Sequence, residues 1–350
     1  MNTKRTLRRI VGAGCTVRAS WAAAPLAVMR EAMQAVLDGA PAPGIEEVRA
    51  AVAAAYTRRG VTAAPDDVRW GIDATRLIAA ASADTIVALM DPGGLETLAV
   101  HIGDGRGAEW DQGFYRGIEY LSSFDELGYR IPLPMHEPKL AQIAAAQGVT
   151  GVAMTAREML QWIRYAQQTG MTIIHDATAG DFVTTAPATL LAVEGAASCV
   201  LETVSLAPCG LPGAVYSVIP AAWQADVDKV RDVPLAEALG RYLVEPELSP
   251  VLAAGVVARY SARGEAEWTE RRQALGAVMA RVRELLDTFG SEYWGGAEIP
   301  VIWTDKRSAA AVAAAYPAAV LHDGADFGPA GAGCVRVDLS GAVRSAKGEE

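Results

Sequence analysis

Thr172-Ile173-Ile174-His175-Asp176-Ala177 is the stretch of the sequence that decides the fold. It is a short apolar run that ends in a carboxylate, which is typical of a buried strand in a parallel sheet. Comparable runs occur at 85–90 (TIVALM) and 198–201 (SCVL), and residues 155–168 have the spacing of an amphipathic helix. Strands that alternate with helices predict an α/β domain with a mainly parallel sheet.

The segments outside this core predict further elements. Two amphipathic helices are expected at 24–38 and 46–59, a short strand at 66–70 and a helix at 73–81. Beyond about residue 220 helices dominate, at 234–243, 249–260 and 265–289, followed by strands at 298–303 and 334–337 with a helix at 308–316. We therefore expect an N-terminal segment (1–40) that packs with the small domain, a large α/β domain (41–222) and a small C-terminal α+β domain (223–350).

Composition restricts the function. The 350 residues are 51% hydrophobic and 21% charged, which fits a globular protein and excludes disorder. A net charge of −10 argues against nucleic acid as a partner. No apolar run reaches the roughly 18 residues of a membrane helix. The four cysteines form no CxxC pair, so we expect reduced cytoplasmic thiols and no metal site.

Lysine is scarce in this chain. The 31 basic residues include only five lysines, and the rest are arginines. The lysines are Lys4, Lys139, Lys229, Lys306 and Lys347. Any chemistry that requires a lysine amine therefore has five candidates.

Four blocks of sequence carry a family resemblance. They are 151–160 (GVAMTAREML), 173–177 (IIHDA), 295–303 (GGAEIPVIW) and 327–336 (FGPAGAGCVR). In this order they resemble the fold-type I pyridoxal-phosphate aminotransferases, in particular the LL-diaminopimelate aminotransferase branch, and the resemblance extends from about residue 10 to 339. It implies a three-layer α/β/α large domain with a mainly parallel sheet, a smaller α+β domain, and a dimer whose active sites lie between subunits.

The same resemblance implies a Schiff-base lysine that this chain does not show at the matching position. In the family the lysine lies in a Ser-x-Ser-Lys segment before a Gly-x-x-Gly turn, and the matching stretch is 204–213 (VSLAPCGLPG). Ala207 occupies the lysine's position or a neighbouring one. A transaminase uses that amine to hold the cofactor and to move a proton.

Other cofactor contacts of the family are also replaced. The phosphate-binding arginine is missing after Gly213, Gly148 replaces an asparagine, and Ala179 replaces a tyrosine. The phosphate loop reads 73–75 (DAT), whose carboxylate would repel a phosphate, and the loop that reaches the neighbouring subunit is shortened to 40–44 (APAPG). We therefore expect a degraded site that binds no pyridoxal phosphate and uses no other cofactor.

Asp176 and Arg336 are the family's site residues that this chain retains. Arg336 matches an arginine that binds a substrate α-carboxylate through two parallel hydrogen bonds; alternatively it pairs with Asp338 or Glu298. Asp176 matches the carboxylate that pairs with the pyridine nitrogen. Without a cofactor it would act as a general acid or base, or it would only cap the turn that follows.

Neighbouring residues supply weaker candidates. His175 is a catalytic candidate or a satisfied structural histidine, on the opposite strand face from Asp176. Cys209 would be a nucleophile if a cation lowered its pKa, and otherwise a buried free cysteine. Ser205 and Glu202 border the same position and are weaker candidates.

The substrate side of the predicted pocket is acidic. Glu298 stands where the resemblance implies Asn or His, and with Arg336 it would recognise an amino-acid zwitterion. Asp326 and Phe327 are expected at the mouth of the same pocket. These residues indicate the charge of a ligand and specify no reaction.

The resulting expectation is an enzyme that works without pyridoxal phosphate on an aminotransferase scaffold, in bacterial specialised metabolism. It would bind an amino-acid-like substrate through Arg336 and catalyse a cyclisation, condensation, dehydration or isomerisation with Asp176, Glu298 or Cys209. One alternative is a non-catalytic homologue that acts as a partner subunit or ligand sensor, and another is an atypical pyridoxal-phosphate-dependent aminotransferase. We expect a homodimer, or a heteromer with a lysine-bearing paralogue.

Overall fold

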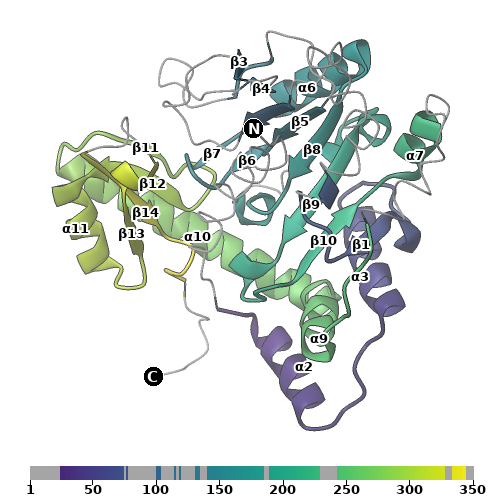
Figure 1. Ribbon diagram of the computed structural model, residues 1–350. Coiled ribbons are helices and arrows are strands. Elements are labelled where there is room, and N and C mark those ends of the chain that lie inside the picture. The colour runs from purple at the N-terminus through teal and green to yellow at the C-terminus, as the bar shows by residue number, and fades with distance from the viewer. Residues whose placement is uncertain are drawn as a thin grey trace.

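The structure, a computed structural model, has a large sheet and a small sheet joined by one long helix (Figure 1). It describes residues 24–74, 76–77, 100–103, 114–115, 118–119, 131–134, 140–184, 189–228, 243–327 and 333–343. The predicted strand at 85–90 and most of the predicted helices at 73–81 and 234–243 lie outside these residues. Ala74, Arg76 and Leu77 are helical, in agreement with the first part of the 73–81 prediction.

The large sheet is mixed and mostly parallel, as expected. Its order is β1-β10-β9-β8-β5-β2, in which β2 (Val100–Gly103), β5 (Leu140–Ile143), β8 (Thr172–Asp176) and β9 (Val200–Ser205) are parallel neighbours. The antiparallel strand β10 (Val215–Val218) pairs with β9 and with β1 (Val68–Trp70). Ile173 and Ile174 are fully buried, which explains why the quoted stretch is apolar on both strand faces.

Helix α6 (Ala156–Thr169) leads directly into β8 and has clear start and stop signals. The Thr155 hydroxyl accepts a hydrogen bond from the Glu158 N–H, and the Glu158 carboxylate accepts one from the Thr155 N–H. Gly170 ends the helix at φ 67°, a conformation that glycine adopts without a steric cost. Trp162, Ile163 and Ala166 are its buried residues. The helix therefore fixes where β8 begins and, through β8, where Asp176 lies.

Three helices form a layer beside β1 and β10 at the lower right of Figure 1. They are α2 (Ala27–Leu37), α3 (Ile45–Arg58) and α9 (Pro250–Arg259), and α9 packs against both α2 and α3. Tyr56 of α3, Tyr216 of β10 and Tyr260 after α9 meet with edge-on ring contacts. Segments from the two ends of the chain thus share the main hydrophobic core.

The small sheet has the order β11-β12-β14-β13 and is antiparallel throughout. Its strands are β11 (Tyr293–Gly295), β12 (Val301–Asp305), β13 (Val320–Asp323) and β14 (Cys334–Asp338), and helix α11 (Lys306–Ala315) follows β12. Helix α10 (Ala262–Thr288) connects the two cores, because Trp268 and Leu275 belong to the large core while Met279 and Val282 belong to the small one.

The remaining described elements are short. They are the 3-10 turns η1 (Pro65–Asp67), η4 (Gly180–Phe182), η5 (Leu190–Ala192), η6 (Ala196–Ser198), η7 (Ala207–Cys209) and η8 (Gly324–Phe327), the ladders β3–β4 (Phe114–Tyr115, Ile118–Glu119) and β6–β7 (Ala146–Gln147, Val152–Ala153), and helix α7 (Ala221–Asp228). The β6–β7 turn of the large domain contacts the small sheet. Gly151 in this turn packs against the backbone of Val301.

Candidate active site

Asp176 is the last residue of β8, at the carboxyl edge of the parallel strands. Its Oδ1 accepts a hydrogen bond from the Thr178 N–H at 3.1 Å, and its side chain is half-buried. Thr203 of β9 is its register partner. Ligands of open α/β sheets bind at this edge, so the position of Asp176 agrees with a ligand-facing carboxylate.

Two hydroxyl groups continue the polar edge from Asp176 toward the end of β9. The Thr178 Oγ1 accepts the Ser205 N–H at 3.0 Å, and the Ser205 Oγ accepts the Ala207 N–H at 3.4 Å. Ala207 begins η7, which closes at Gly210 with φ 85°. A β carbon at Gly210 would lie 2.5 Å from the Pro25 nitrogen, so this turn packs closely against the N-terminal part of the described chain.

Ala207 places no amine beside this polar edge. Among the residues that the structure describes, Lys306 is the one lysine, and it is an exposed residue of α11 whose Nζ lies 3.7 Å from the Asp323 carboxylate. The other four lysines lie outside the described residues.

Asp73 caps a helical turn beside the same strands. Its Oδ1 accepts the Arg76 N–H at 3.0 Å, as an N-cap carboxylate does. The preceding carbonyl, of Ile72, accepts the Ser217 hydroxyl of β10 at 2.6 Å. The segment that the resemblance matches to a phosphate loop therefore lies next to β9 and β10, with a carboxylate on the Arg76 N–H.

His175 and Glu202 form a buried pair on the face of the sheet opposite Asp176. The His175 Nδ1 lies 2.7 Å from Glu202 Oε2, and its Nε2 accepts the Ala145 N–H at 3.2 Å. Both ring nitrogens are therefore engaged, in the pattern of a neutral imidazole with its proton on Nδ1. The Glu202 carboxylate also accepts hydrogen bonds from the Tyr56 and Thr189 hydroxyls. The contacts of His175 are those of a structural residue.

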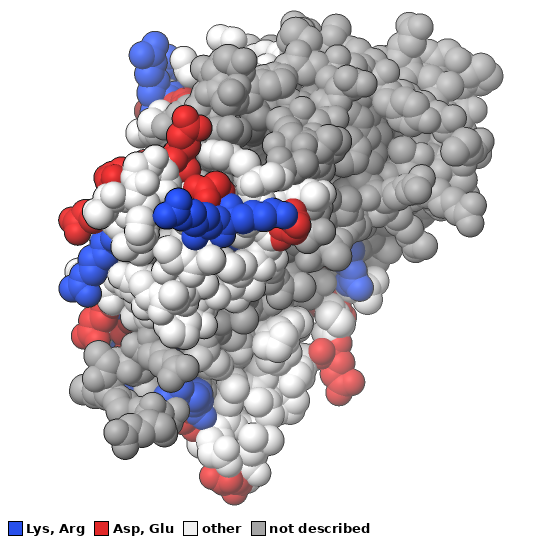
Figure 2. Space-filling model, turned by 90° about the vertical axis from the view of Figure 1, so that its left-hand side faces the viewer, with Lys and Arg blue, Asp and Glu red and all other residues white. Residues whose placement is uncertain are grey.

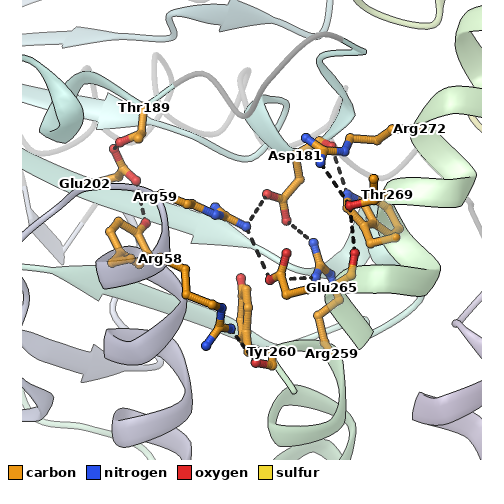
Figure 3. Close-up of polar contacts among 12 residues, drawn as sticks. Arg58, Arg59, Asp181, Thr189, Glu202, Arg259, Tyr260, Glu265, Thr269 and Arg272 are labelled. Carbon is orange, nitrogen blue, oxygen red and sulfur yellow. Dashed lines mark hydrogen bonds and ion pairs between the residues drawn. The ribbon is translucent and has the colours of Figure 1, made fainter. Parts of the chain in front are cut away.

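A buried charge cluster lies next to this pair (Figure 3). Asp181 accepts hydrogen-bonded or ionic contacts from Arg59 and Arg259, each at 2.9 Å, and Glu265 lies 3.1 Å from Arg259. Burial acts to raise the pKa of Asp181, but the guanidinium groups of Arg59, Arg259 and Arg272 together outweigh burial and the pKa is lowered. The cluster joins α3, η4, α9 and α10, four elements that are distant in sequence, and sequence reasoning had not identified it.

Cys209 has the environment of an inert thiol. It is 2% exposed, and burial raises its pKa to about 12, although a hydrogen bond with Arg259 opposes the shift. A thiol with this pKa is protonated at neutral pH and is a poor nucleophile. These properties correspond to the buried free cysteine that the sequence left as an alternative.

Arg336 is fully buried where β14 meets the β6–β7 turn. Its Nη2 donates to the Gly148 carbonyl at 2.6 Å, its Nε donates to the Val149 carbonyl at 3.3 Å, and its Nη1 lies 3.6 Å from the Asp338 carboxylate. Burial lowers the pKa of Arg336, which Asp338 partly opposes. Its guanidinium therefore fastens the small sheet to the large domain.

Glu298 makes a second contact between the same two parts. Its Oε2 accepts the Ala153 N–H at 3.2 Å, and its carbonyl accepts the Thr184 N–H at 2.9 Å. Asp326 and Phe327 end η8, and the structure does not describe their side chains. Among the predicted site residues, the structure thus brings Arg336 and Glu298 to one domain contact and Asp176 to the sheet edge with Ser205.

The described residues show neither a metal site nor a membrane span. No group of three or more His, Cys, Asp or Glu side chains among them has an arrangement that could hold a metal ion. None of the described helices is long and apolar enough to cross a membrane.

Comparison with known proteins places this fold. No family model matches the chain. A 271-residue stretch is 27% identical to the LL-diaminopimelate aminotransferase of Methanosphaera stadtmanae, covering 73% of this chain and 66% of that protein. The chain spans between half and two thirds of the length of the curated relatives it matches first.

Solved structures agree on the fold. The L,L-diaminopimelate aminotransferase of Chlamydomonas reinhardtii has a TM-score of 0.69 at 19% identity, covering 91% of this chain and 84% of that one. A PLP-bound aminotransferase structure from Clostridium difficile has a TM-score of 0.64 at 13% identity, covering 92% and 87%. The chain has the fold-type I aminotransferase fold, as the sequence predicted.

These comparisons correct the expected chemistry. An enzyme that works without pyridoxal phosphate, at a lysine-less and cofactor-free site, was expected from the replaced contacts. That expectation is wrong, because the relatives in sequence are named aminotransferases and a solved neighbour holds pyridoxal phosphate. The alternative of an atypical pyridoxal-phosphate-dependent aminotransferase fits better.

Proposed function

We propose that this protein is an atypical pyridoxal-phosphate-dependent aminotransferase that acts on an amino-acid-like substrate. The observation that carries the proposal is the position of Asp176, at the carboxyl edge of β8 and beside the hydroxyls of Thr178 and Ser205. The similarity to named LL-diaminopimelate aminotransferases over 271 residues supports it. The name of a relative does not fix the substrate of this chain, so the proposal is limited to the class of amino acids.

The residues at the sheet edge fit the cofactor in part. Asp176 is half-buried at the sheet edge, which suits a carboxylate that keeps a pyridine nitrogen protonated. Ser205 and Thr178 offer hydroxyl groups next to it. When bound, the cofactor supplies an electron sink for the bonds at the substrate's α-carbon. The residue at this turn, Ala207, differs from the one that the resemblance implies, and this difference is what makes the site atypical.

The residues of the chain would share the other tasks. The Asp176 carboxylate would accept a hydrogen bond from the protonated ring nitrogen, and the Ser205 and Thr178 hydroxyls would orient the ligand along the strand edge. The Asp73 carboxylate already occupies the N–H of Arg76, so an anion reaches this turn only by displacing it. Likewise, a substrate carboxylate reaches Arg336 only by displacing the Gly148 and Val149 carbonyls.

We also propose that the protein is a homodimer, as the resemblance implies. The exposed Leu37 at the end of α2, 65% accessible, is an apolar side chain that a second subunit would cover. Sedimentation equilibrium tests this. A dimer is expected at micromolar concentration, and a monomer at every concentration would contradict it.

The experiment for the proposed function is an amino-acid conversion assay. The purified protein, supplied with pyridoxal phosphate, is incubated with single amino acids, LL-diaminopimelate included, and a 2-oxo acid acceptor, and the new amino acid is measured. We expect conversion of at least one amino acid, and its loss in Asp176→Asn. Asp38→Asn, an exposed carboxylate at the end of α2, is the matched control and should retain activity.

The same samples identify the amine that contacts the cofactor. After borohydride reduction, peptide mass spectrometry locates any lysine that carries a pyridoxyl group. Failure of every amino acid to react, together with no modified lysine, would contradict the proposal. It would favour the alternative of a non-catalytic homologue.

A further inference from the structure

A cavity lies in the small domain, formed by residues that take no part in the candidate active site. Its volume is about 400 Å³, and its walls are the end of α10, strands β11 and β12, the first turn of α11 and Cys334 of β14. Binding sites for small molecules fall between roughly 300 and 1,000 Å³. The cavity is thus large enough for one amino acid or a molecule of similar size.

Most polar groups of the wall already have partners. The Asp305 Oδ1 accepts the N–H groups of Arg307 and Ser308, and the Ser308 hydroxyl donates to Asp305 Oδ2 at 2.6 Å. The Ser291 and Ser308 hydroxyls are 2.5 Å apart. The Thr304 hydroxyl donates to the Glu292 carbonyl at 2.9 Å. These contacts fix the shape of the cavity and leave few groups for a ligand.

Two opposite charges remain available. Within the described part of the chain, the Arg307 guanidinium and the Glu292 carboxylate have no ion pair or side-chain hydrogen bond, and they do not pair with each other. Both line the same cavity. Figure 2, which views the molecule from the small-domain side, shows basic and acidic side chains set around a broad uncharged surface. Both residues are exposed, and an unpaired cation and anion in the wall of one cavity complement a zwitterion.

The rest of the wall is aromatic or apolar. Trp294 lines the cavity and stacks on Trp303, with ring centroids 5.4 Å apart and an interplanar angle of 9°. Phe289 is 53% exposed at the same cavity. An aromatic ring of a ligand packs favourably against aromatic side chains of this kind. The apolar wall therefore favours an aromatic ligand over a short aliphatic one.

We propose that this cavity binds a free aromatic L-α-amino acid. Its carboxylate contacts Arg307, its ammonium group contacts Glu292, and its ring packs against Trp294 and Phe289. The indole below, of Trp303, donates to the Val149 carbonyl at 2.8 Å, the same carbonyl that accepts Arg336. The side chains of Trp294 and Trp303 thus separate the ligand from the Val149 carbonyl at the contact between the domains. This site is independent of the proposed transamination.

The probe is L-phenylalanine, and its binding is measured by titration calorimetry on the whole protein. Hydrogen bonds to charged groups contribute enough that Arg307→Gln and Glu292→Gln should each weaken binding about tenfold or more. Lys306→Gln is the matched control, because Lys306 is the neighbouring exposed cation but pairs with Asp323 and does not line the cavity. Hydrocinnamate, which lacks the amine, and phenethylamine, which lacks the carboxylate, should both bind more weakly.

The alkylation rate of Cys334 indicates where the ligand binds. Cys334 is half-buried in the cavity wall, and L-phenylalanine should slow its alkylation by iodoacetamide, as followed by peptide mass spectrometry. Binding at the sheet edge beside Asp176 would leave the alkylation rate of Cys334 and the affinity of Arg307→Gln unchanged. That result, or the absence of saturable binding, would overturn the proposal, while the conversion assay above would be unaffected.

Discussion

Arg336 matches a binding motif in sequence, but its contacts in the structure stabilise the fold. The sequence left open whether it binds a carboxylate or pairs with Asp338 or Glu298. In the structure it lies 3.6 Å from Asp338 and donates to two carbonyls of the β6–β7 turn. Asp176, by contrast, is half-buried at a strand end. The difference arises from burial, which a motif does not reveal.

Replacing Arg336 should therefore reduce stability. Arg336→Gln leaves Asp338, 1% exposed, without its cation, and breaking a buried pair in this way typically costs about 3–5 kcal/mol. Urea unfolding measures the loss, and Arg336→Lys, which keeps the charge, should recover part of it. Arg157→Gln, on the exposed side of α6, is the control. Equal unfolding midpoints for Arg336→Gln and Arg157→Gln would contradict the role of Arg336.

Cys209 makes stability depend on pH in the alkaline range. Burial raises its pKa from 9.0 to about 12 in the folded protein, so between these values the unfolded chain loses a proton that the folded chain keeps. Stability is therefore fully present below pH 9 and falls as the pH rises toward 12, by up to about 1.4 kcal/mol per pH unit. Cys209→Ala should make this slope shallower, while Cys334→Ala should not. Equal slopes of stability against pH for the two variants would contradict the role of Cys209.

The β6–β7 turn and the small sheet pack closely against each other. A β carbon on Gly151, at φ 77°, would lie 2.4 Å from the Val301 carbonyl oxygen. Arg336 and Glu298 span the same contact. Backbone shape and side-chain bonds therefore hold the two sheets together at one place.

Gly151→Ala tests this contact. Gly170→Ala is the matched control, because Gly170 also has a positive φ, 67°, but nothing lies within 4 Å of the added methyl group. The strained backbone alone costs about 1–2 kcal/mol in each variant. Gly151→Ala should lose clearly more, since it also clashes with Val301. Equal losses of stability for Gly151→Ala and Gly170→Ala in thermal unfolding would contradict this, because the contact with Val301 would then accept the methyl group without a cost.

Elements with strong periodicity could be predicted from the sequence. Helix α6, strand β8, helix α10 and strands β12 and β14 occur close to their expected positions. The short strands β5 and β10 were missed, because Gln142 and Ser217 interrupt their apolar pattern although both are buried. Their pairing depends on neighbours far away in the chain, which local periodicity does not record.

The candidate site could be predicted only where it is local. Asp176 follows an apolar strand, so its position at the sheet edge was evident from the sequence. Tyr56 and Thr189, which donate hydrogen bonds to Glu202, come from segments with no motif in common. The Asp181 cluster likewise joins residues that lie up to 206 positions from one another (Arg59 to Glu265). Three-dimensional packing alone brings them together.

At the scale of the whole molecule, α10 is the element that unites the two domains, because its 27 residues contribute to both cores. At 1.5 Å per residue such a helix is about 40 Å long. The division into a large domain (41–222) and a small domain (223–350) remains a prediction. In the structure α9, at 250–259, packs against α2 and α3, so part of the C-terminal half contributes to the large core.

We propose that this fold binds pyridoxal phosphate through Asp176. A direct test is the amount of pyridoxal phosphate that the protein retains after exhaustive dialysis, read from its visible absorbance. We expect about one cofactor per chain, and markedly less for Asp176→Asn than for Asp38→Asn. Retention no greater than that of an unrelated protein, or equal retention by both variants, would contradict it.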